Sequence, residues 1–359
     1  MNQRVSLRDI AKATGFSHST VSLALRRHHS IPAGTRTQIE EAAKKLGYCV
    51  DPDLAGLMKR YRNKTAPSYQ ATLAWINTWP NPRLLFQYYK ETWEGACERA
   101  KELGYNLESF DLKAPGMTTH RLSQVLKARN IQGLILPPQP RARAHFNFDW
   151  ENFAIVAIGY SISPSCFHTI TSEQYRAAFI AMRNLRQLGY RRIGFVDHDR
   201  SMERTDYNYL GGYLVQQRRF KASEQIPPLI FKAPEPRAFV SDPSKVANLK
   251  EQISRWLLQY RPECLLYHLP QIGDWVRELG YSVPNDIGLA SFHAVSSIAV
   301  QSGIDQNTRQ VGAMSIDILT GLVLRGEFGI PKIPNRHLVS GTWVAGQTVR
   351  NLVSPGNDA

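Results

Sequence analysis

The sequence predicts an α/β protein in which a small three-helix head precedes a larger body built from parallel sheets. The first 47 residues show only the helical spacing of apolar residues. From residue 71 onward, short apolar runs typical of strands alternate with helical patterns. This alternation is typical of parallel sheets covered by helices on both faces. With 359 residues, 43% of them hydrophobic, the chain is long enough to fill more than one core.

Two short amphipathic helices open the head, joined by a turn that contains Gly15. Ser6 and Asp9 have the spacing of a helix-capping pair, so a first helix is expected to start there. Gly15 suits a positive φ, and Ser17 can cap the second helix. The outward side chains of that helix are His18, Ser19, Thr20, Ser22 and Leu23. This layout is a helix-turn-helix, which places its second helix in the major groove of DNA.

A third helix is expected to complete a small core in the head. It starts at Pro32 and stops at Gly47, a residue favoured just after a helix end. The apolar stripes of the three helices follow the 3.6-residue period. They comprise Leu7, Ile10, Ala11, Val21, Ala24, Leu25, Ile39, Ala42, Ala43 and Leu46. A helical bundle that binds protein is the alternative interpretation.

The head is strongly basic. Residues 1–64 carry twelve Lys and Arg against five Asp and Glu, so this segment holds +7 of the chain's formal net charge of +14. A segment that neutralises phosphates is expected to be basic, whereas a solvated basic face is the alternative. Together with the helix spacing, the charge favours DNA as the partner of the head.

Composition argues against several other classes of protein. The chain has no apolar run of the length of a signal peptide or a membrane helix, which favours a cytoplasmic protein without a membrane partner. The four cysteines, Cys49, Cys97, Cys166 and Cys264, lack the spacing of zinc ligands, so we expect free thiols, no metal and no cofactor. The motifs of nucleotide binding, zinc proteases and serine hydrolases are absent, which argues against an enzyme.

Beyond a hinge or linker at 51–66, the body is expected to alternate strands and helices. The expected strands lie at 71–77, 105–110, 132–138, 153–159, 191–197, 227–231, 264–268 and 287–292, and the helices at 84–103, 119–129, 175–188, 205–219, 244–260 and 271–279. In open α/β sheets, ligands bind beyond the carboxyl ends of the strands. The expected pocket walls are therefore the loops after Asn77, Pro137, Gly159, Asp197, His268 and Phe292.

One polar cluster admits two interpretations. His198 stands between Asp197 and Asp199 at the end of an expected strand, and such a group can act as acid and base or hold a metal ion. A solvated strand end is the simpler interpretation. Two alternative functions therefore stay open, namely an enzyme with a DNA-binding head and a ligand-binding transport protein.

Along nearly its full length the chain resembles the LacI family of bacterial transcriptional regulators. The stretches VSLRDIAKATGFSHSTVSLALR and IPAGTRTQIEEAAKKLGY match the family's head, and the patch around Leu54 to Met58 its hinge helix. QGLILPP, LRQLGYRRIGF, VPNDIGLASF and LVSGTW match its effector domain more loosely. The resemblance implies a two-lobe domain like a periplasmic binding protein, crossed three times by the chain. It also implies a homodimeric repressor or activator, of which we expect a repressor, with double-stranded operator DNA and a small-molecule effector as partners.

The resemblance implies the following domain limits. A helix-turn-helix domain occupies 1–50, a hinge helix and linker 51–66, an effector-binding and dimerisation domain 67–350, and a tail 351–359. Within the effector domain, one lobe comprises about 70–168 and 295–329, and the other about 169–294 and 330–350.

The residues that match the family's DNA contacts lie in the head and the hinge. His18 and Ser19 match its base readers, and Leu23 stands where many members carry Arg, which implies a different operator preference. Leu57 matches a Leu that inserts into the minor groove, with a buried linker residue as the alternative. The implied DNA-binding set is Ser6, Ser17, His18, Ser19, Thr20, Ser22, Leu23, Arg26, Arg36, Leu54, Leu57 and Met58.

The effector cleft departs from the family pattern at three places. Glu173 and Gln174 replace an Asp-Asn pair, Tyr209 stands where an Arg grips the ligand, and His293 replaces an Asp. We therefore expect a neutral or weakly charged polar effector, with a carbohydrate as one candidate. The expected contacts are Asn77, Trp79, Tyr89, Tyr160, Glu173, His198, Tyr209 and His293. A structural role is the alternative for each of them.

Overall fold

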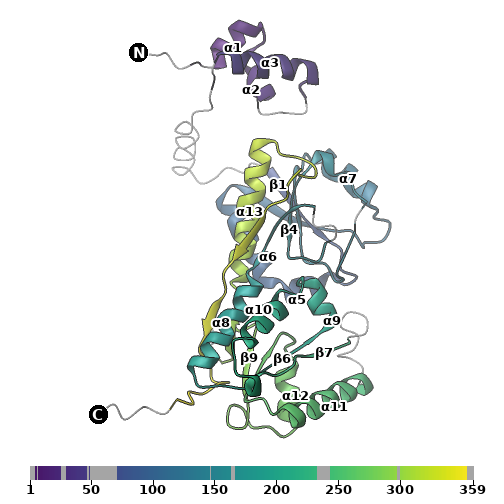
Figure 1. Cartoon of the computed structure of the whole chain (residues 1–359). Coiled ribbons are helices and arrows are strands. Elements are labelled where there is room, and N and C mark those ends of the chain that lie inside the picture. The colour runs from purple at the N-terminus through teal and green to yellow at the C-terminus, as the bar shows by residue number, and fades with distance from the viewer. Residues whose placement is uncertain are drawn as a thin grey trace, which may run out of the picture.

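The structure is a computed structural model that describes residues 5, 7–25, 30–46, 48, 71–145, 147–162, 166–232, 243–296 and 300–353. These residues form a helical head and an α/β body of two lobes (Figure 1). Five of the residues expected to contact DNA lie outside the described ranges: Ser6, Arg26, Leu54, Leu57 and Met58. Since residues 49–70 between the head and the body also lie outside them, the two parts are described separately.

Three helices form the head, as the sequence predicts. They are α1 (Leu7–Thr14), α2 (His18–Leu25) and α3 (Ala33–Leu46). The buried core of the head contains Ile10, Val21, Ala24, Ile31, Ile39 and Ala43. The apolar stripe of α3 is shorter than expected, because Leu46 lies at the end of the helix and is 40% exposed.

The first lobe is built on a six-stranded sheet with the strand order β11-β5-β4-β3-β1-β2. The strands are β1 (Ala71–Asn77), β2 (Tyr105–Asp111), β3 (Gly133–Leu136), β4 (Ala154–Ile158), β5 (His168–Ser172) and β11 (Arg336–Val339). All neighbouring strands are parallel. Its helices are α5 (Pro82–Tyr88), α6 (Lys90–Glu102), α7 (Thr119–Ala128) and α13 (Thr308–Arg325). Helices α6 and α13 share one core with the sheet and α7 a second, so both faces of the sheet are covered.

The second lobe repeats this plan with the strand order β12-β10-β9-β8-β6-β7. The strands are β6 (Ile193–His198), β7 (Leu229–Phe231), β8 (Cys264–Tyr267), β9 (Gly288–Ser291), β10 (Ser302–Asp305) and β12 (Thr342–Val344). Here β12 runs antiparallel to β10. The helices are α8 (Gln174–Gln187), α9 (Asp199–Arg204), α10 (Asn208–Gln217), α11 (Pro243–Tyr260) and α12 (Ile272–Glu278). The predicted α/β class with two parallel-sheet lobes is confirmed.

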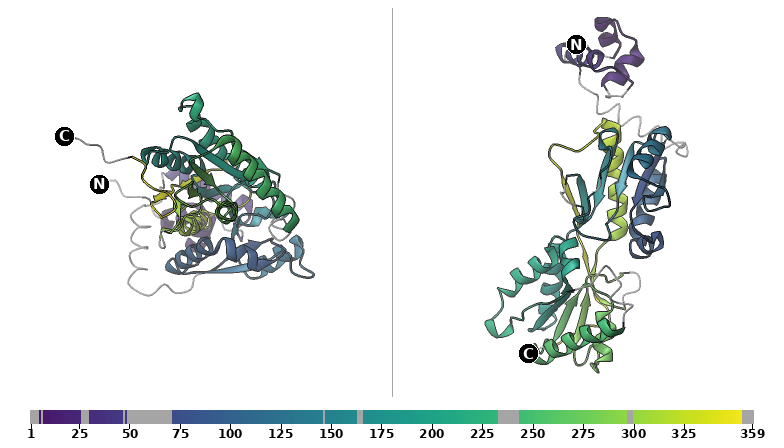
Figure 2. Two further views of the ribbon diagram at one scale, coloured as in Figure 1. Left: turned by 90° about the horizontal axis from the view of Figure 1, so that it is seen from below. Right: turned by 90° about the vertical axis from the view of Figure 1, so that its right-hand side faces the viewer.

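The chain passes between the lobes three times, and the C-terminal segment runs from one lobe to the other in Figure 2. The passages follow β5, β10 and β11. Because β5 and β11 pair in the first sheet and β10 in the second, each passage lies later in the chain than the expected lobe limits.

Side-chain hydrogen bonds tie the three passages to one another. Ser340 Oγ donates to Glu173 Oε2 over 2.8 Å, and Asn307 Nδ2 donates to the Ser340 carbonyl oxygen over 2.7 Å. The Glu173 amide also donates to the Val339 carbonyl oxygen over 2.8 Å. Each passage is therefore bonded to at least one of the other two.

Two expected helices differ in the structure. The helix expected at 84–103 breaks at Tyr89, whose φ of −122° and ψ of 28° are not helical. The helix expected at 205–219 starts later, as α10 at Asn208, because Asp206 and Tyr207 have φ values of 50° and 56°. The short helix α9 precedes these two residues, where no helix was expected. Left-handed residues cannot continue a right-handed helix.

Helices α6 and α13 approach each other closely through a glycine on each. A Cβ atom on Gly312 would lie 1.9 Å from the carbonyl oxygen of Thr92. A Cβ atom on Gly95 would lie 2.1 Å from the carbonyl oxygen of Arg309. Because backbone atoms cannot move aside easily, only glycine fits at either position.

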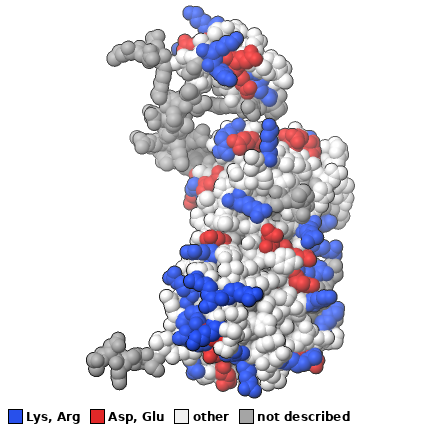
Figure 3. All heavy atoms as spheres, viewed as in Figure 1, with Lys and Arg blue, Asp and Glu red and all other residues white. Residues whose placement is uncertain are grey.

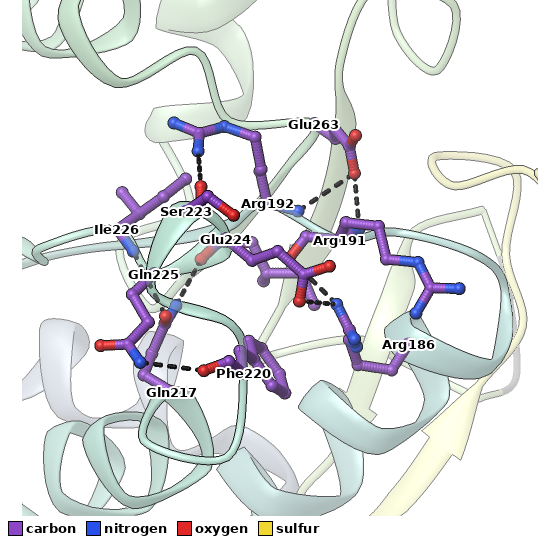
Figure 4. A network of polar contacts seen from close by, with 11 residues as sticks. Arg186, Arg191, Arg192, Gln217, Phe220, Ser223, Glu224, Gln225, Ile226 and Glu263 are labelled. Carbon is purple, nitrogen blue, oxygen red and sulfur yellow. Dashed lines mark hydrogen bonds and ion pairs between the residues drawn. The ribbon is translucent and has the colours of Figure 1, made fainter.

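Basic side chains gather over the second lobe around α8 (Figure 3). The exposed arginines of α8, α10 and the loops after them are Arg176, Arg183, Arg191, Arg218 and Arg219. Arg186 is used differently, since its Nη1 lies 3.0 Å from Glu224 Oε2 and its guanidinium stacks on Phe220 (Figure 4). Glu263 likewise accepts from the backbone amides of Arg191 and Arg192. This network therefore stabilises the lobe. Within the described ranges, no helix is both long and apolar enough to cross a membrane.

Candidate DNA-contacting head and interlobe site

The turn between α1 and α2 has the geometry that its residues predict. Gly15 has a φ of 73°, and its amide donates to the Ala11 carbonyl oxygen over 2.9 Å. The Thr20 amide donates to Ser17 Oγ over 3.1 Å, so Ser17 caps α2. The expected turn and cap are confirmed.

The outward face of α2 is polar at its start. His18 and Ser19 are exposed, whereas Thr20, Ser22 and Leu23 are half-buried. Ser17 Oγ lies 2.8 Å from both Ser19 Oγ and Thr20 Oγ1, so these hydroxyl groups form one cluster. Leu23 packs partly against the head core, which reduces the apolar surface that it can offer to a base. The first turn of α2 is therefore the part most open to a groove.

Arg36 supports the backbone of the head. Its Nη2 donates to the Ile31 carbonyl oxygen over 3.2 Å, and its side chain is half-buried. In contrast, Arg8 and Lys12 on α1 are exposed. A phosphate contact by Arg36 would share its guanidinium with this structural bond.

The first-lobe wall of the interlobe site lies at the carboxyl ends of β1 and β3. Asn77 Oδ1 accepts from the Trp79 amide over 3.0 Å, and Trp79 Nε1 donates to the Pro138 carbonyl oxygen over 2.9 Å. Tyr89 contacts the edge of the Trp79 ring at a centroid distance of 6.2 Å. Trp79 is only 2% exposed, so its ring is enclosed in this structure.

A hydrogen bond joins the lobes where α5 meets α9 (Figure 1), and others hold the passage after β10 against the second lobe. Arg204 Nη2 on α9 donates to Tyr89 Oη over 2.7 Å. Gln306 Nε2, which follows β10, donates to Tyr209 Oη and also to the Phe292 carbonyl oxygen. Burial raises the pKa of Tyr209, so its hydroxyl stays protonated. Tyr89 and Tyr209, both expected in the cleft, therefore lie at the boundary between the lobes.

Four polar atoms at this boundary are buried without a hydrogen-bond partner among the described residues. Two are donors, Asn77 Nδ2 and Arg204 Nε, and two are acceptors, Oε1 of Gln174 and of Gln306. Nearly all buried polar groups in proteins have partners. A small molecule that carries both donors and acceptors would supply the missing bonds.

The second-lobe wall holds four side chains in a row. Asp197 at the end of β6 is fully buried, and its Oδ2 lies 3.0 Å from Ser201 Oγ on α9. Ser201 Oγ also lies 3.0 Å from His268 Nδ1, and His268 Nε2 lies 3.0 Å from His293 Nε2. Burial raises the pKa of Asp197 to about 8. The expectation that this acidic strand end is solvated is therefore wrong for Asp197.

Three expected effector contacts lie apart from this group. His198 Nδ1 accepts from the Ser201 amide, so it caps α9. Glu173 is bonded within the passages between the lobes. Tyr160 lines a separate cavity of about 170 Å³ with the basic and acidic side chains of Arg143, Glu203, Asp206 and Arg336.

A larger cavity of about 530 Å³ lies beyond the amino ends of β8 and β9, between the end of α11, Tyr281 and Arg350. None of the expected contact residues lines it. The chemistry therefore favours the interlobe boundary over the larger hollow.

Sequence reasoning missed Arg204, Ser201 and Gln306. Ser201 carried a weak signal, since it follows Asp197 by four residues in a segment that turns helical. Arg204 and Gln306 carried none, because their partners are distant in sequence. Among the residues that the structure describes, no three His, Cys, Asp or Glu side chains form a group that could hold a metal ion.

Two family comparisons match different parts of the chain. Residues 6–51 match the bacterial regulatory proteins of the lacI family, and residues 182–349 match the periplasmic binding protein-like domain. The first segment contains the helix-turn-helix, and the second most of the second lobe.

Curated relatives are similar to part of the chain. The HTH-type transcriptional regulator MalR of Streptococcus pneumoniae serotype 4 is 23% identical over 221 residues, which are 60% of this chain and 64% of MalR. The HTH-type transcriptional repressor CytR of Escherichia coli (strain K12) is 24% identical over 218 residues, which are 60% of this chain and 59% of CytR. The chain thus spans about three-fifths of the length of these relatives.

Solved structures share the fold over most of the chain. The transcriptional regulator CelR in complex with cellobiose has a TM-score of 0.56 at 15% identity, with 96% of this chain and 100% of CelR covered. The lac repressor dimer bound to operator and the anti-inducer ONPF has a TM-score of 0.54 at 18% identity, covering 96% and 99%. The chain therefore combines a helix-turn-helix segment that matches the lacI family of bacterial regulatory proteins, residues 6–51, with a periplasmic binding protein-like domain, residues 182–349.

Proposed function

We propose that this chain is a cytoplasmic, sequence-specific DNA-binding transcriptional repressor that is not an enzyme. It binds a palindromic operator as a homodimer, because each chain supplies one recognition helix and a two-fold pair reads two symmetric half-sites. The capped α2 with its exposed His18 and Ser19 supports this proposal most directly. The lac repressor neighbour, a dimer bound to operator, supports it by likeness.

We further propose that a small polar molecule between the lobes controls DNA binding. The four unpartnered polar atoms at the boundary support this, since two donors and two acceptors suit a ligand rich in hydroxyl groups. The CelR neighbour holds cellobiose, which supports a carbohydrate. A ligand shifts the lobes only if it binds one arrangement more tightly, and these atoms would supply that difference.

Selection of bound duplexes from a random pool, with and without cellobiose or maltose, tests both proposals. A two-fold symmetric site whose binding responds to sugar supports them. Affinity is expected to fall steeply with salt, because basic residues of the head displace counterions from phosphates. An asymmetric site bound by a monomer would contradict the dimeric operator, and an unchanged response to every sugar would contradict carbohydrate control.

His18→Ala and Ser19→Ala are each expected to relax the preference at one position of each half-site. The expected loss is about 1–3 kcal/mol against the preferred base, because these exposed side chains start the recognition helix. Lys12→Ala, on the exposed face of α1, is the control and should weaken all duplexes alike. Titration of single-base operator variants measures the difference. A uniform loss in all three variants would show that α2 does not read bases.

Tyr209→Phe is expected to weaken sugar binding by about 1–3 kcal/mol and to leave DNA binding without sugar unchanged. The substitution removes the hydroxyl group at the lobe boundary that accepts a hydrogen bond from Gln306 Nε2. Tyr213→Phe is the matched control, because its hydroxyl bonds to the Ile193 and Ile226 carbonyl oxygens inside the second lobe. Calorimetry with cellobiose and maltose measures both. Equal affinities in the two variants would move the effector site elsewhere.

A further inference from the structure

The row of Asp197, Ser201, His268 and His293 forms a continuous hydrogen-bonded chain from a fully buried carboxyl group to an exposed imidazole. Its three links are each 3.0 Å long. In such a chain the donor in one link decides the donor in the next, because each hydroxyl and each neutral imidazole carries a single proton. The two ends of the chain are therefore coupled.

We propose that Asp197 determines, through Ser201 and His268, whether His293 offers a hydrogen-bond donor or an acceptor to the effector. This inference rests on the proposed effector site between the lobes. It assigns His293 to ligand contact, and it assigns Asp197, Ser201 and His268 to positioning its proton.

With Asp197 protonated, every donor points outward. Asp197 Oδ2–H donates to Ser201 Oγ, whose hydroxyl donates to His268 Nδ1. His268 Nε2–H then donates to His293 Nε2, which leaves the His293 proton on Nδ1. The chain holds four protons, and His293 offers a donor.

With Asp197 ionised, every donor points inward. Ser201 donates to Asp197 Oδ2, His268 Nδ1–H donates to Ser201, and His293 Nε2–H donates to His268 Nε2. The chain now holds three protons, because one has left to solvent. His293 Nδ1 then carries a lone pair and can accept a hydrogen bond, and no donor to it is found among the described residues.

The surroundings of Asp197 favour its protonated form near neutral pH. The groups that face it are the His198 amide, which donates to Oδ1 over 2.7 Å, and the Ser201 hydroxyl. Tyr209 on α10 stays neutral, and the ring of His268, which follows β8, lies 5.4 Å from the Tyr209 ring between centroids. Burial raises the pKa of Asp197 to about 8, and no described Lys or Arg lowers it. As the pH rises through that value, Asp197 loses its proton.

This arrangement selects the chemistry of the ligand. At neutral pH the donor form of His293 suits an oxygen that only accepts, such as a carbonyl, a carboxylate or the ring oxygen of a sugar. A hydroxyl group, which both donates and accepts, is bound by either form. The effector is thus expected to place an acceptor oxygen against His293.

The tautomer of His293 is measured directly by 15N NMR of full-length protein labelled on histidine, with His293→Gln to assign its signals. The two ring nitrogens are expected to exchange chemical shifts between about pH 7 and about pH 9, either side of the pKa of Asp197 at about 8. Asp197→Asn is expected to keep the proton on Nδ1 at both pH values, because an amide donates to Ser201 as the protonated acid does.

Two further variants separate this relay from a general effect of charge. Ser201→Ala breaks the hydrogen-bonded chain, so the His293 tautomer should no longer follow the pH. Asp199→Asn removes a carboxylate at the first residue of α9, outside the chain, and should leave the exchange intact. An exchange that persists in Ser201→Ala, or its absence from the unsubstituted protein, would overturn the proposal. Since no effector is used, either outcome leaves the proposed control of DNA binding to its own test.

Discussion

Gly312→Ala is expected to destabilise the first lobe by about 1–3 kcal/mol or more. The new Cβ atom would lie 1.9 Å from the Thr92 carbonyl oxygen, so α13 and α6 would have to move apart. The core that these helices share with the sheet, including Ala96 and Leu319, would then lose its close packing. Urea unfolding followed by tryptophan fluorescence measures the loss.

Gly321→Ala on the same helix is the matched control. Its nearest neighbour would be the flexible Arg325 side chain at 3.1 Å, which can move aside. Alanine also favours helix, so this variant should be neutral or more stable by about 0.4–1 kcal/mol. If both variants lowered stability equally, the close approach of the α6 and α13 backbones would not be the cause of the loss.

Val21→Asp is expected to abolish specific operator binding, a loss of about 10³-fold or more. Val21 is fully buried in a head core of six residues, and an unpaired carboxylate there costs several kcal/mol. A domain of this size has little stability to lose. Gel-shift titration measures the affinity, and circular dichroism measures the loss of helix.

Gln38→Asp controls for the added negative charge, because it places the same carboxylate on an exposed position of α3. It should keep the head folded and retain most of the operator affinity. If Gln38→Asp abolished binding as completely as Val21→Asp, repulsion of phosphates would be the cause of both losses.

The sequence predicted local features of the fold well. The head helices, the Ser17 cap and the buried strand β3 follow from spacing and capping, which depend on neighbouring residues. Strand β5 was missed, because HTITS contains a single apolar residue, Ile170, and therefore no apolar run. Its pairing with β11 joins residues far apart in the chain, and local patterns carry no information about such pairs.

The interlobe site was predictable only in part, for the same reason. Asn77 and Trp79 follow a strand, so their place at the sheet edge could be expected. Arg204 matters through the approach of the other lobe, and Gln306 through Tyr209, which is 97 residues away in the sequence; no spacing encodes either contact. His198 and Asp197 are neighbours on one strand and bond to different groups of Ser201, its amide and its hydroxyl. Only the directions of their side chains therefore distinguish a helix cap from a buried acid.

The hydrogen bonds between the three passages have a consequence for how the lobes can move. Because Glu173, Asn307 and Ser340 link all three passages by hydrogen bonds, a movement that pulled the passages apart would break these bonds, whereas a rotation of one lobe about the passages would keep them. Strand β1 runs from Ala71 to Asn77 at the lobe boundary, so Ala71 lies about 20 Å from Asn77 along the strand. A small rotation at the boundary would therefore move Ala71, the first described residue of the body, by several ångströms. In a dimer, such a rotation would set the distance between the Ala71 residues of the two chains.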